Sequence, residues 1–141
     1  MIAPSAAERY LATVAIPTTA KMVAIVDDDE SMRSALHSML KSVGFPSQGF
    51  ASAEEFLRSG QQQQTGCLIT DLRMPGMSGL ELQANLNAEL SRIPIIFISA
   101  HGDEELRLQA LRAGAVEFLA KPFDHKKLLE MVRMALESGN Q

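Results

Sequence analysis

Short apolar runs alternate with longer amphipathic stretches five times between residues 22 and 138, and this alternation constrains the fold most strongly. The runs at residues 22–26 and 94–98 are almost entirely apolar. A strand with one wet face alternates apolar and polar residues, whereas continuous runs are typical of strands covered on both faces. We therefore predict an α/β domain of three layers, in which helical crossovers cover both faces of a five-stranded parallel sheet.

The expected strands and helices follow from these patterns. Apolar residues spaced three or four apart predict the helices, and Gly44 and Gly114 act as stop signals. The order Ser52-Ala53-Glu54-Glu55 has the form of a capping box. We expect strands at residues 22–26, 45–50, 67–70, 94–98 and 115–119, helices at residues 31–43, 52–58, 80–90, 103–112 and 124–137, and loops at residues 61–64 and 74–79.

The chain has room for one compact domain. It contains 141 residues, of which 46% are hydrophobic and 21% charged, as in ordinary globular proteins. We expect this domain at residues 22–138, a flexible N-terminal extension at residues 1–21 and a short tail at residues 139–141. The extension lacks the basic start and long apolar core of a signal peptide. No apolar run reaches the ~20 residues that cross a bilayer, so we expect no membrane association.

Charge and cysteine content exclude several classes of protein. The formal net charge is -4, which argues against direct nucleic-acid binding by this chain. A single cysteine, Cys67, excludes an internal disulfide and a cysteine-rich zinc site. One free thiol suits the reducing cytoplasm, which is the expected location.

Four of the five expected strands deliver a charged or hydroxyl side chain at the carboxyl end. In parallel α/β sheets these ends meet at one edge, where binding sites form. We therefore expect carboxylates, a hydroxyl and an ammonium to lie together there. The residues concerned are Asp27, Asp28 and Asp29 after the first strand, Asp71 after the third, Ser99 after the fourth and Lys121 after the fifth.

This combination of groups indicates phosphoryl chemistry assisted by a metal. Clustered carboxylates repel one another unless a cation joins them, and few carboxylates with room for water suit Mg²⁺. One carboxylate, Asp71, could then attack phosphorus in line and form an acyl phosphate. Lys121 would neutralise phosphoryl oxygens, and Ser99 would donate a hydrogen bond to one of them.

Four segments together resemble the receiver domains of two-component response regulators. The resemblance covers about residues 22–138, and the segments occur in the family's order and spacing. Residues 99–103 further resemble the receivers of nitrogen-fixation and related regulators, which usually carry a helix-turn-helix output domain. The four segments are Val26-Asp27-Asp28-Asp29-Glu30, residues 70–79 from Thr70 to Gly79, Ile98-Ser99-Ala100 and Lys121-Pro122-Phe123.

The resemblance implies a flavodoxin-like fold with strand order 2-1-3-4-5 and a magnesium site. Asp71 matches the phosphoacceptor. Asp28 matches the acid that binds Mg²⁺ directly, and Asp27 its neighbour, whose contact usually passes through water. Arg73 matches the position whose backbone carbonyl completes the protein ligands, which also include Asp71. Mn²⁺ could substitute for Mg²⁺.

The remaining family positions concern the response to phosphorylation. Ser99 stands where the family has threonine or serine, and Lys121 matches the lysine before a proline whose preceding bond is commonly cis. Phe118 matches the aromatic switch position, where a tyrosine would add a hydroxyl. Alone, Phe118 is more often a core aromatic, and an acidic triplet such as Asp27–Asp29 is more often a solvated strand end.

The function implied is a switch controlled by phosphorylation. A sensor histidine kinase or phosphotransfer protein would phosphorylate Asp71, and the surface of the fourth helix, fifth strand and last helix would change, altering a partner or a homodimer contact. The domain would catalyse only its own phosphorylation and dephosphorylation. A pseudo-receiver that acts only as an interaction module is the alternative. A phosphohydrolase would need a second acid two residues after Asp71, where Arg73 stands.

Overall fold

The computed structural model describes residues 21–100 and 104–138, which form one parallel five-stranded sheet with helices on both faces. The strand order is β2-β1-β3-β4-β5, as expected. The predictions for residues 1–20, for 101–103 and for the tail 139–141 lie outside the described residues. The strands are β1 (Met22–Val26), β2 (Ser47–Phe50), β3 (Thr65–Asp71), β4 (Ile95–Ser99) and β5 (Glu117–Ala120).

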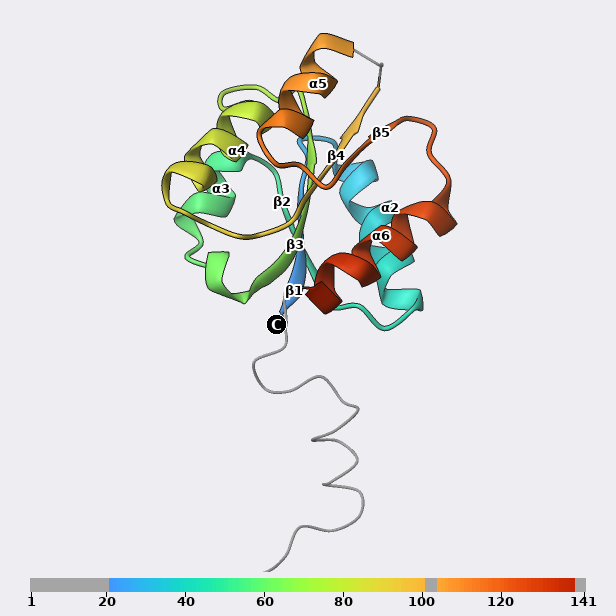
Figure 1. Ribbon diagram of the computed structural model, residues 1–141. Coiled ribbons are helices and arrows are strands. Elements are labelled where there is room, and N and C mark those ends of the chain that lie inside the picture. The colour runs from blue at the N-terminus through green and yellow to red at the C-terminus, as the bar shows by residue number, and fades with distance from the viewer. Residues whose placement is uncertain (1–20, 101–103, 139–141) are drawn as a thin grey trace, which may run out of the picture.

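Among the described residues, two helices cover one face of the sheet and three cover the other (Figure 1). On the first face lie α2 (Glu30–Ser42) and α6 (His125–Ser138), and on the second lie α3 (Ala53–Arg58), α4 (Gly79–Ala88) and α5 (Glu104–Arg112). This is the predicted three-layer arrangement. No helix in the described parts of the chain is both long and apolar enough to cross a membrane.

The two cores explain why the strands lack polar alternation. All five residues of β4 are buried. Ile96 and Ile98 pack in the layer of α2 and α6, whereas Phe97 between them packs in the layer of α3, α4 and α5. Because both faces are covered, each position along the strand favours an apolar side chain.

Side chains cap the starts of several helices in the described parts of the chain. The Asp29 carboxylate accepts hydrogen bonds from the first turn of α2, and the Ser52 hydroxyl accepts one from Glu55 N–H at 3.0 Å. The predicted capping box at Ser52 is only half formed, because the Glu55 carboxylate accepts Ala51 N–H at 3.0 Å rather than the N–H of Ser52. Each cap satisfies helix N–H groups that would otherwise lack a partner.

Several boundaries differ from those expected. Strand β3 begins two residues early and includes Asp71, while β2 and β5 each begin two residues late. The expected loop at residues 61–64 contains a short 3₁₀ turn, Gln62–Gln64. Helix α4 begins at Gly79, inside the expected loop, because Ser78 and Glu81 form a complete capping box that was not predicted.

The prediction that α4 reaches Leu90 was wrong. The helix ends at Ala88, and Leu90 has a φ angle of 59° and is 86% exposed. Hydrogen bonds from Leu90 N–H to Asn87 O (3.0 Å) and from Ser91 N–H to Leu86 O (2.9 Å) form a Schellman motif. Leu90 matches the helical spacing from Leu86, but it occupies the left-handed position that ends the helix.

We predict that Leu90→Gly stabilises the fold. The equivalent positions after α2 and α5 are Gly44 and Gly114, both with positive φ. A left-handed conformation costs a residue with a Cβ atom about 1–2 kcal/mol, whereas the greater freedom of glycine in the unfolded chain offsets about half of that gain. The free energy of unfolding in urea is expected to rise by about 0.5–1 kcal/mol.

Leu90→Ala is the matched control for this prediction. It also removes the exposed side chain but keeps the Cβ atom, so it retains the strained backbone. A glycine variant no more stable than the alanine variant would show that Leu90 carries no such strain.

Candidate functional site

Three of the predicted acids meet at the carboxyl edge of the sheet. Asp27 and Asp28 follow β1, and Asp71 is the last residue of β3. Carboxylate oxygens of the three residues lie within 4.8 Å of one another. Asp29 stays outside this group because its carboxylate caps α2. The three acids Asp27, Asp28 and Asp71 are called the acid cluster below.

Asp27 is the most buried member of the acid cluster, with 3% of its surface exposed. Burial raises the pKa of this carboxyl, and repulsion by the Asp71 and Asp28 carboxylates acts in the same direction. A hydrogen bond from Asp29 N–H at 2.9 Å and the charge of Lys121 oppose the rise. The ionised form of Asp27 is therefore less stable here than in water, and an additional positive charge at this edge would stabilise it.

Lys121 places its ammonium between two of the acids. Its Nζ atom lies 3.8 Å from Asp27 Oδ2 and 3.7 Å from Asp71 Oδ2. The Lys121-Pro122 bond is cis, as the resemblance implied. Lys121 N–H donates to the Ser99 carbonyl oxygen at 2.7 Å, which ties the ends of β4 and β5 together.

Hydrogen bonds hold both the carboxylate and the backbone carbonyl of Asp71, and the side chain remains accessible to solvent. Its side chain is 15% exposed, against 4% for that of Asp27. Arg73 N–H donates to Asp71 Oδ1 at 3.2 Å, and the Thr70 hydroxyl donates to Asp71 O at 3.0 Å. A Cβ atom on Gly79 would overlap the Asp71 carbonyl oxygen, so only glycine lets α4 begin this close to β3.

Ser99 ends β4, the strand next to that of Asp71, and Phe118 lies on β5, one strand further along the sheet. Ile98 pairs with Asp71 across β3 and β4, and Ser99 is the next residue, 5% exposed. Phe118 is buried, and its ring centroid lies 6.4 Å from that of Phe97. Their roles in phosphate binding and switching stay predictions, as does the use of the Arg73 carbonyl as a ligand.

The histidines outside residues 101–103 take no part in the acid cluster. His37 lies on the exposed face of α2, with Nδ1 2.7 Å from the Ser47 hydroxyl. His125 begins α6, and its ring centroid lies 5.6 Å from that of Phe123. Both histidines are exposed on helix surfaces.

Two charged residues near the site were not predicted. The Arg33 guanidinium donates to Asp27 O at 2.6 Å, and the Glu54 carboxylate accepts Met77 N–H at 3.2 Å in the loop after β3. A signal existed for Arg33, because helical side chains lean toward the helix N-terminus and it lies near the start of α2. The sequence offered no comparable signal for Glu54, whose partner is 23 residues away.

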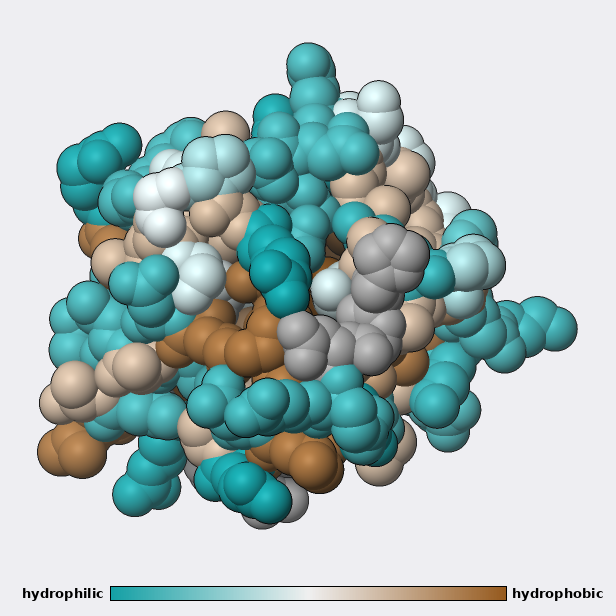
Figure 2. Space-filling view, turned by 90° about the horizontal axis from the view of Figure 1, so that it is seen from above, coloured by the Kyte–Doolittle hydropathy of each residue, from teal (hydrophilic) through white to brown (hydrophobic). Residues whose placement is uncertain are grey.

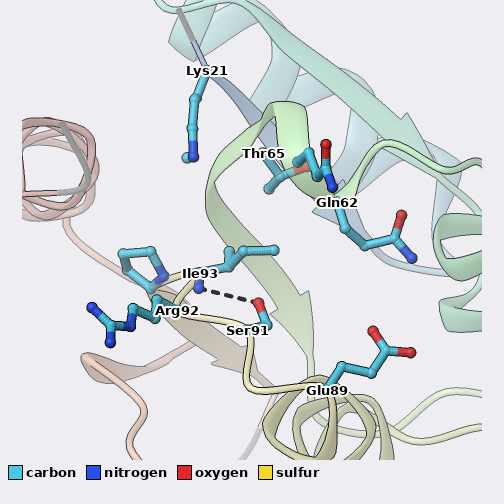
Figure 3. Close-up of a pocket in the computed structure, with 10 residues that line it drawn as sticks. Lys21, Gln62, Thr65, Glu89, Ser91, Arg92 and Ile93 are labelled. Atoms are coloured by element: carbon cyan, nitrogen blue, oxygen red, sulfur yellow. Dashed lines mark hydrogen bonds between the residues drawn. The ribbon is translucent and has the colours of Figure 1, made fainter. Parts of the chain in front are cut away.

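The acid cluster and Lys121 all lie at the carboxyl edge of the sheet. Figure 2 looks onto the carboxyl edge and shows hydrophilic residues beside hydrophobic ones near the middle of that face. A cavity of about 650 Å³ lies at the opposite edge, where Lys21, Thr65 and Ile93 stand near the starts of β1, β3 and β4 (Figure 3). That cavity contains no member of the acid cluster, so we assign it no part in this chemistry.

Comparison with known sequences agrees with this geometry. Residues 23–133 match the response regulator receiver domain family. The response regulator protein TodT of Pseudomonas putida is 44% identical over 122 residues, which are 86% of this chain and 54% of TodT. The transcriptional regulatory protein FixJ of Azorhizobium caulinodans is 41% identical over 123 residues, which are 84% of this chain and 58% of FixJ. The chain thus spans little more than half the length of these relatives.

Solved structures show the same architecture. The structure described as FixJ-N is 44% identical, with a TM-score of 0.76 over 83% of this chain and 94% of its own. The response regulator StyR is 46% identical, with a TM-score of 0.79 over 85% of this chain and 61% of its own. With the fold, the strand order and the family match in agreement, the chain belongs to the receiver domain family of two-component response regulators.

Proposed function

We propose that this receiver domain accepts a phosphoryl group on Asp71 from a sensor histidine kinase or a phosphotransfer protein. One observation carries the proposal: the accessible Asp71 carboxylate lies in the acid cluster with the Lys121 ammonium 3.7 Å away. A pseudo-receiver has no need of this complete set of charged groups, so the set argues against a module that only binds proteins. The description of TodT as a response regulator and of FixJ as a transcriptional regulatory protein also supports a regulatory function.

The acid cluster fits a hard divalent cation. Three carboxylates face one ammonium, which leaves negative charge unbalanced at this edge of the sheet. Oxygen ligands of this kind suit Mg²⁺ or Mn²⁺. We assign the ligands to Asp27, Asp28, Asp71 and the Arg73 carbonyl. When bound, Mg²⁺ would supply positive charge beside the phosphoryl oxygens.

The side chains then have separate tasks in the transfer. An Asp71 carboxylate oxygen attacks phosphorus in line, the P–N bond of the phosphohistidine donor breaks, and the acyl phosphate forms as the histidine leaves. Lys121 neutralises one phosphoryl oxygen, and the Ser99 hydroxyl donates a hydrogen bond to another. The chain acts only on itself in this scheme, so it is not a turnover enzyme.

The signal leaves through α5, β5 and α6. Phe118 packs in the same core as Ala110 of α5, so a shift of Ser99 toward the phosphoryl group, with rotation of Phe118, would change that surface. The altered surface would contact an output domain, a partner or a second copy of the chain. Transcription would be regulated indirectly, because a net charge of -4 disfavours nucleic-acid binding by this chain.

We place this signalling in the cytoplasm. The thiol of Cys67 is buried in β3, and burial raises its pKa to about 12, so it stays protonated and packs as an apolar group. A protein whose single cysteine stays a reduced thiol does not need the oxidising compartment in which disulfides form.

The first prediction of this section concerns the phosphoacceptor. Asp71→Asn removes the nucleophilic carboxylate, so covalent labelling by acetyl phosphate with Mg²⁺ is expected to fall to background. Phosphate-affinity electrophoresis and intact mass measure the product. Asp124→Asn is the control, because Asp124 is exposed and its carboxylate accepts Lys126 N–H at 2.9 Å, a hydrogen bond that an asparagine side chain can also accept. Equal labelling of the Asp71 variant would place the phosphoryl group elsewhere.

The second prediction concerns Asp27 in protein kept free of metal with EDTA. Above the raised pKa of folded Asp27 the buried charge destabilises the fold, so Asp27→Asn is expected to be the more stable protein at neutral pH. As pH falls through that pKa, folded Asp27 takes up a proton and the advantage of the variant shrinks. Urea unfolding at several pH values measures the difference.

The exposed Asp28 provides the control for this pH series. Asp28→Asn relieves repulsion without relieving burial, so its gain in stability is expected to be smaller than that of Asp27→Asn. An advantage of Asp27→Asn that grows toward acid pH would contradict the raised pKa.

The third prediction separates labelling from switching. Ser99→Ala removes the hydroxyl but not Asp71, so Asp71 is still labelled while hydrogen exchange in α5 and β5 no longer responds to phosphorylation. Ser99→Thr keeps the hydroxyl and is expected to preserve the response. Exchange measured by mass spectrometry on labelled and unlabelled protein compares them, and equal responses of the two variants would exclude this role for Ser99.

A further inference from the structure

Glu54 joins a separate helix to the loop that follows the phosphoacceptor. It stands in the first turn of α3, and its Oε2 atom accepts Met77 N–H at 3.2 Å. Its other oxygen, Oε1, is buried and has no hydrogen-bond partner among the residues that the structure describes. A buried carboxylate oxygen without a partner is costly, so a contact kept at that cost calls for an explanation beyond packing.

Several hydrogen bonds join the loop between β3 and α4 to residues near it in the sequence. Arg73 N–H binds the Asp71 carboxylate, and Gly79 N–H donates to Leu72 O at 2.9 Å. Ser78 N–H donates to Glu81 of the following helix at 3.1 Å. The hydrogen bond of Glu54 differs from these contacts because it joins the loop to another helix, α3, whose residues are distant in the sequence.

Gly76 lets the Glu54 carboxylate come this close. Its φ angle is +76°, a conformation that side chains disfavour. A Cβ atom at Gly76 would also lie 2.5 Å from Glu54 Oε2. The glycine therefore both permits the turn and leaves space for the carboxylate.

We propose that Glu54 is a positioning residue for the phosphorylation site. By fixing Met77 it restricts the loop that carries Arg73, and so holds the Arg73 carbonyl in place to serve the acid cluster. The inference rests on the proposed function, since it assigns Glu54 to the same metal-dependent reaction. Glu54 contacts neither Asp71 nor Lys121 in any described interaction, so its effect passes through the loop.

Three variants test the role of Glu54. Glu54→Ala removes the acceptor of Met77 N–H, whereas Glu54→Gln keeps a carbonyl oxygen of the same shape. Glu55→Ala is the matched control, because Glu55 lies on the same short helix and its carboxylate accepts only Ala51 N–H among the hydrogen bonds described. Urea unfolding of all three variants shows how far each change simply weakens α3.

The first readout is hydrogen exchange of residues 72–78 in metal-free protein. Exchange is expected to quicken in Glu54→Ala and to stay close to that of the unaltered chain in Glu54→Gln and Glu55→Ala. Unchanged exchange in Glu54→Ala would overturn the proposal, because the loop would then not depend on the carboxylate.

The second readout is the affinity for Mg²⁺ measured by calorimetry without a phosphodonor. Glu54→Ala is expected to raise Kd about 5- to 10-fold, a range typical of coupling between neighbouring sites. Glu54→Gln is expected to restore most of the affinity, and Glu55→Ala to leave it unchanged. Equal weakening by Glu54→Ala and Glu55→Ala would indicate a structural role and overturn the proposal.

Gly76→Ala provides an independent route to the same contact. Its Cβ atom displaces the Glu54 carboxylate, so combining it with Glu54→Ala is expected to raise the Kd for Mg²⁺ by less than the product of the two single effects. Full additivity would show that the two residues act separately and would overturn the proposal.

Failure of this inference can be told apart from failure of the proposed function. If the unaltered chain binds Mg²⁺ and is labelled on Asp71 while Glu54→Ala matches it in Kd, only the role of Glu54 is rejected. If the unaltered chain binds no Mg²⁺, the proposed function and the inference are rejected together.

Discussion

The repulsion among three carboxylates at one sheet edge is the interaction on which the site depends. The parallel sheet brings the ends of β1 and β3 together, so Asp27, Asp28 and Asp71 cannot separate without disturbing the core. Lys121 balances part of their charge, while burial, with repulsion by Asp71 and Asp28 added to it, raises the pKa of Asp27. An edge built in this way favours a cation and, beside it, an anionic phosphoryl group.

Backbone contacts determine how firmly this charged edge is held. Arg33 fixes the carbonyl of Asp27, and Lys121 N–H fixes that of Ser99. The loop after Asp71 is tied by its own amides and by Glu54 from α3. Charged side chains of the described residues therefore serve two purposes: some form the site, and others hold the backbone that presents it.

Periodicity and chain order predicted the three-layer fold and the meeting of the acids at one edge, whereas the strand order followed from the resemblance to a known family. Continuous apolar runs imply strands covered on both faces, and the residues after them, such as Asp71 and Lys121, must then share an edge. Periodicity failed at Leu90, which keeps helical spacing although a Schellman motif has already ended α4. The contact of Glu54 with Met77 depends on how α3 packs beside the loop after β3. The two residues are 23 positions apart, so no local sequence pattern predicts the contact.

Strand β5 explains how one charged edge can influence both helical layers. Phe118 packs in the core shared with Ala110 of α5, whereas the next residue, Leu119, packs in the core shared with Leu128 of α6. Lys121 follows directly after the strand, within reach of the acid cluster. Tightly packed cores transmit displacement. A movement of Lys121 toward a phosphoryl group would therefore shift Phe118 in one core and Leu119 in the other. The surface of α5, β5 and α6 is therefore where a change at Asp71 should be detected.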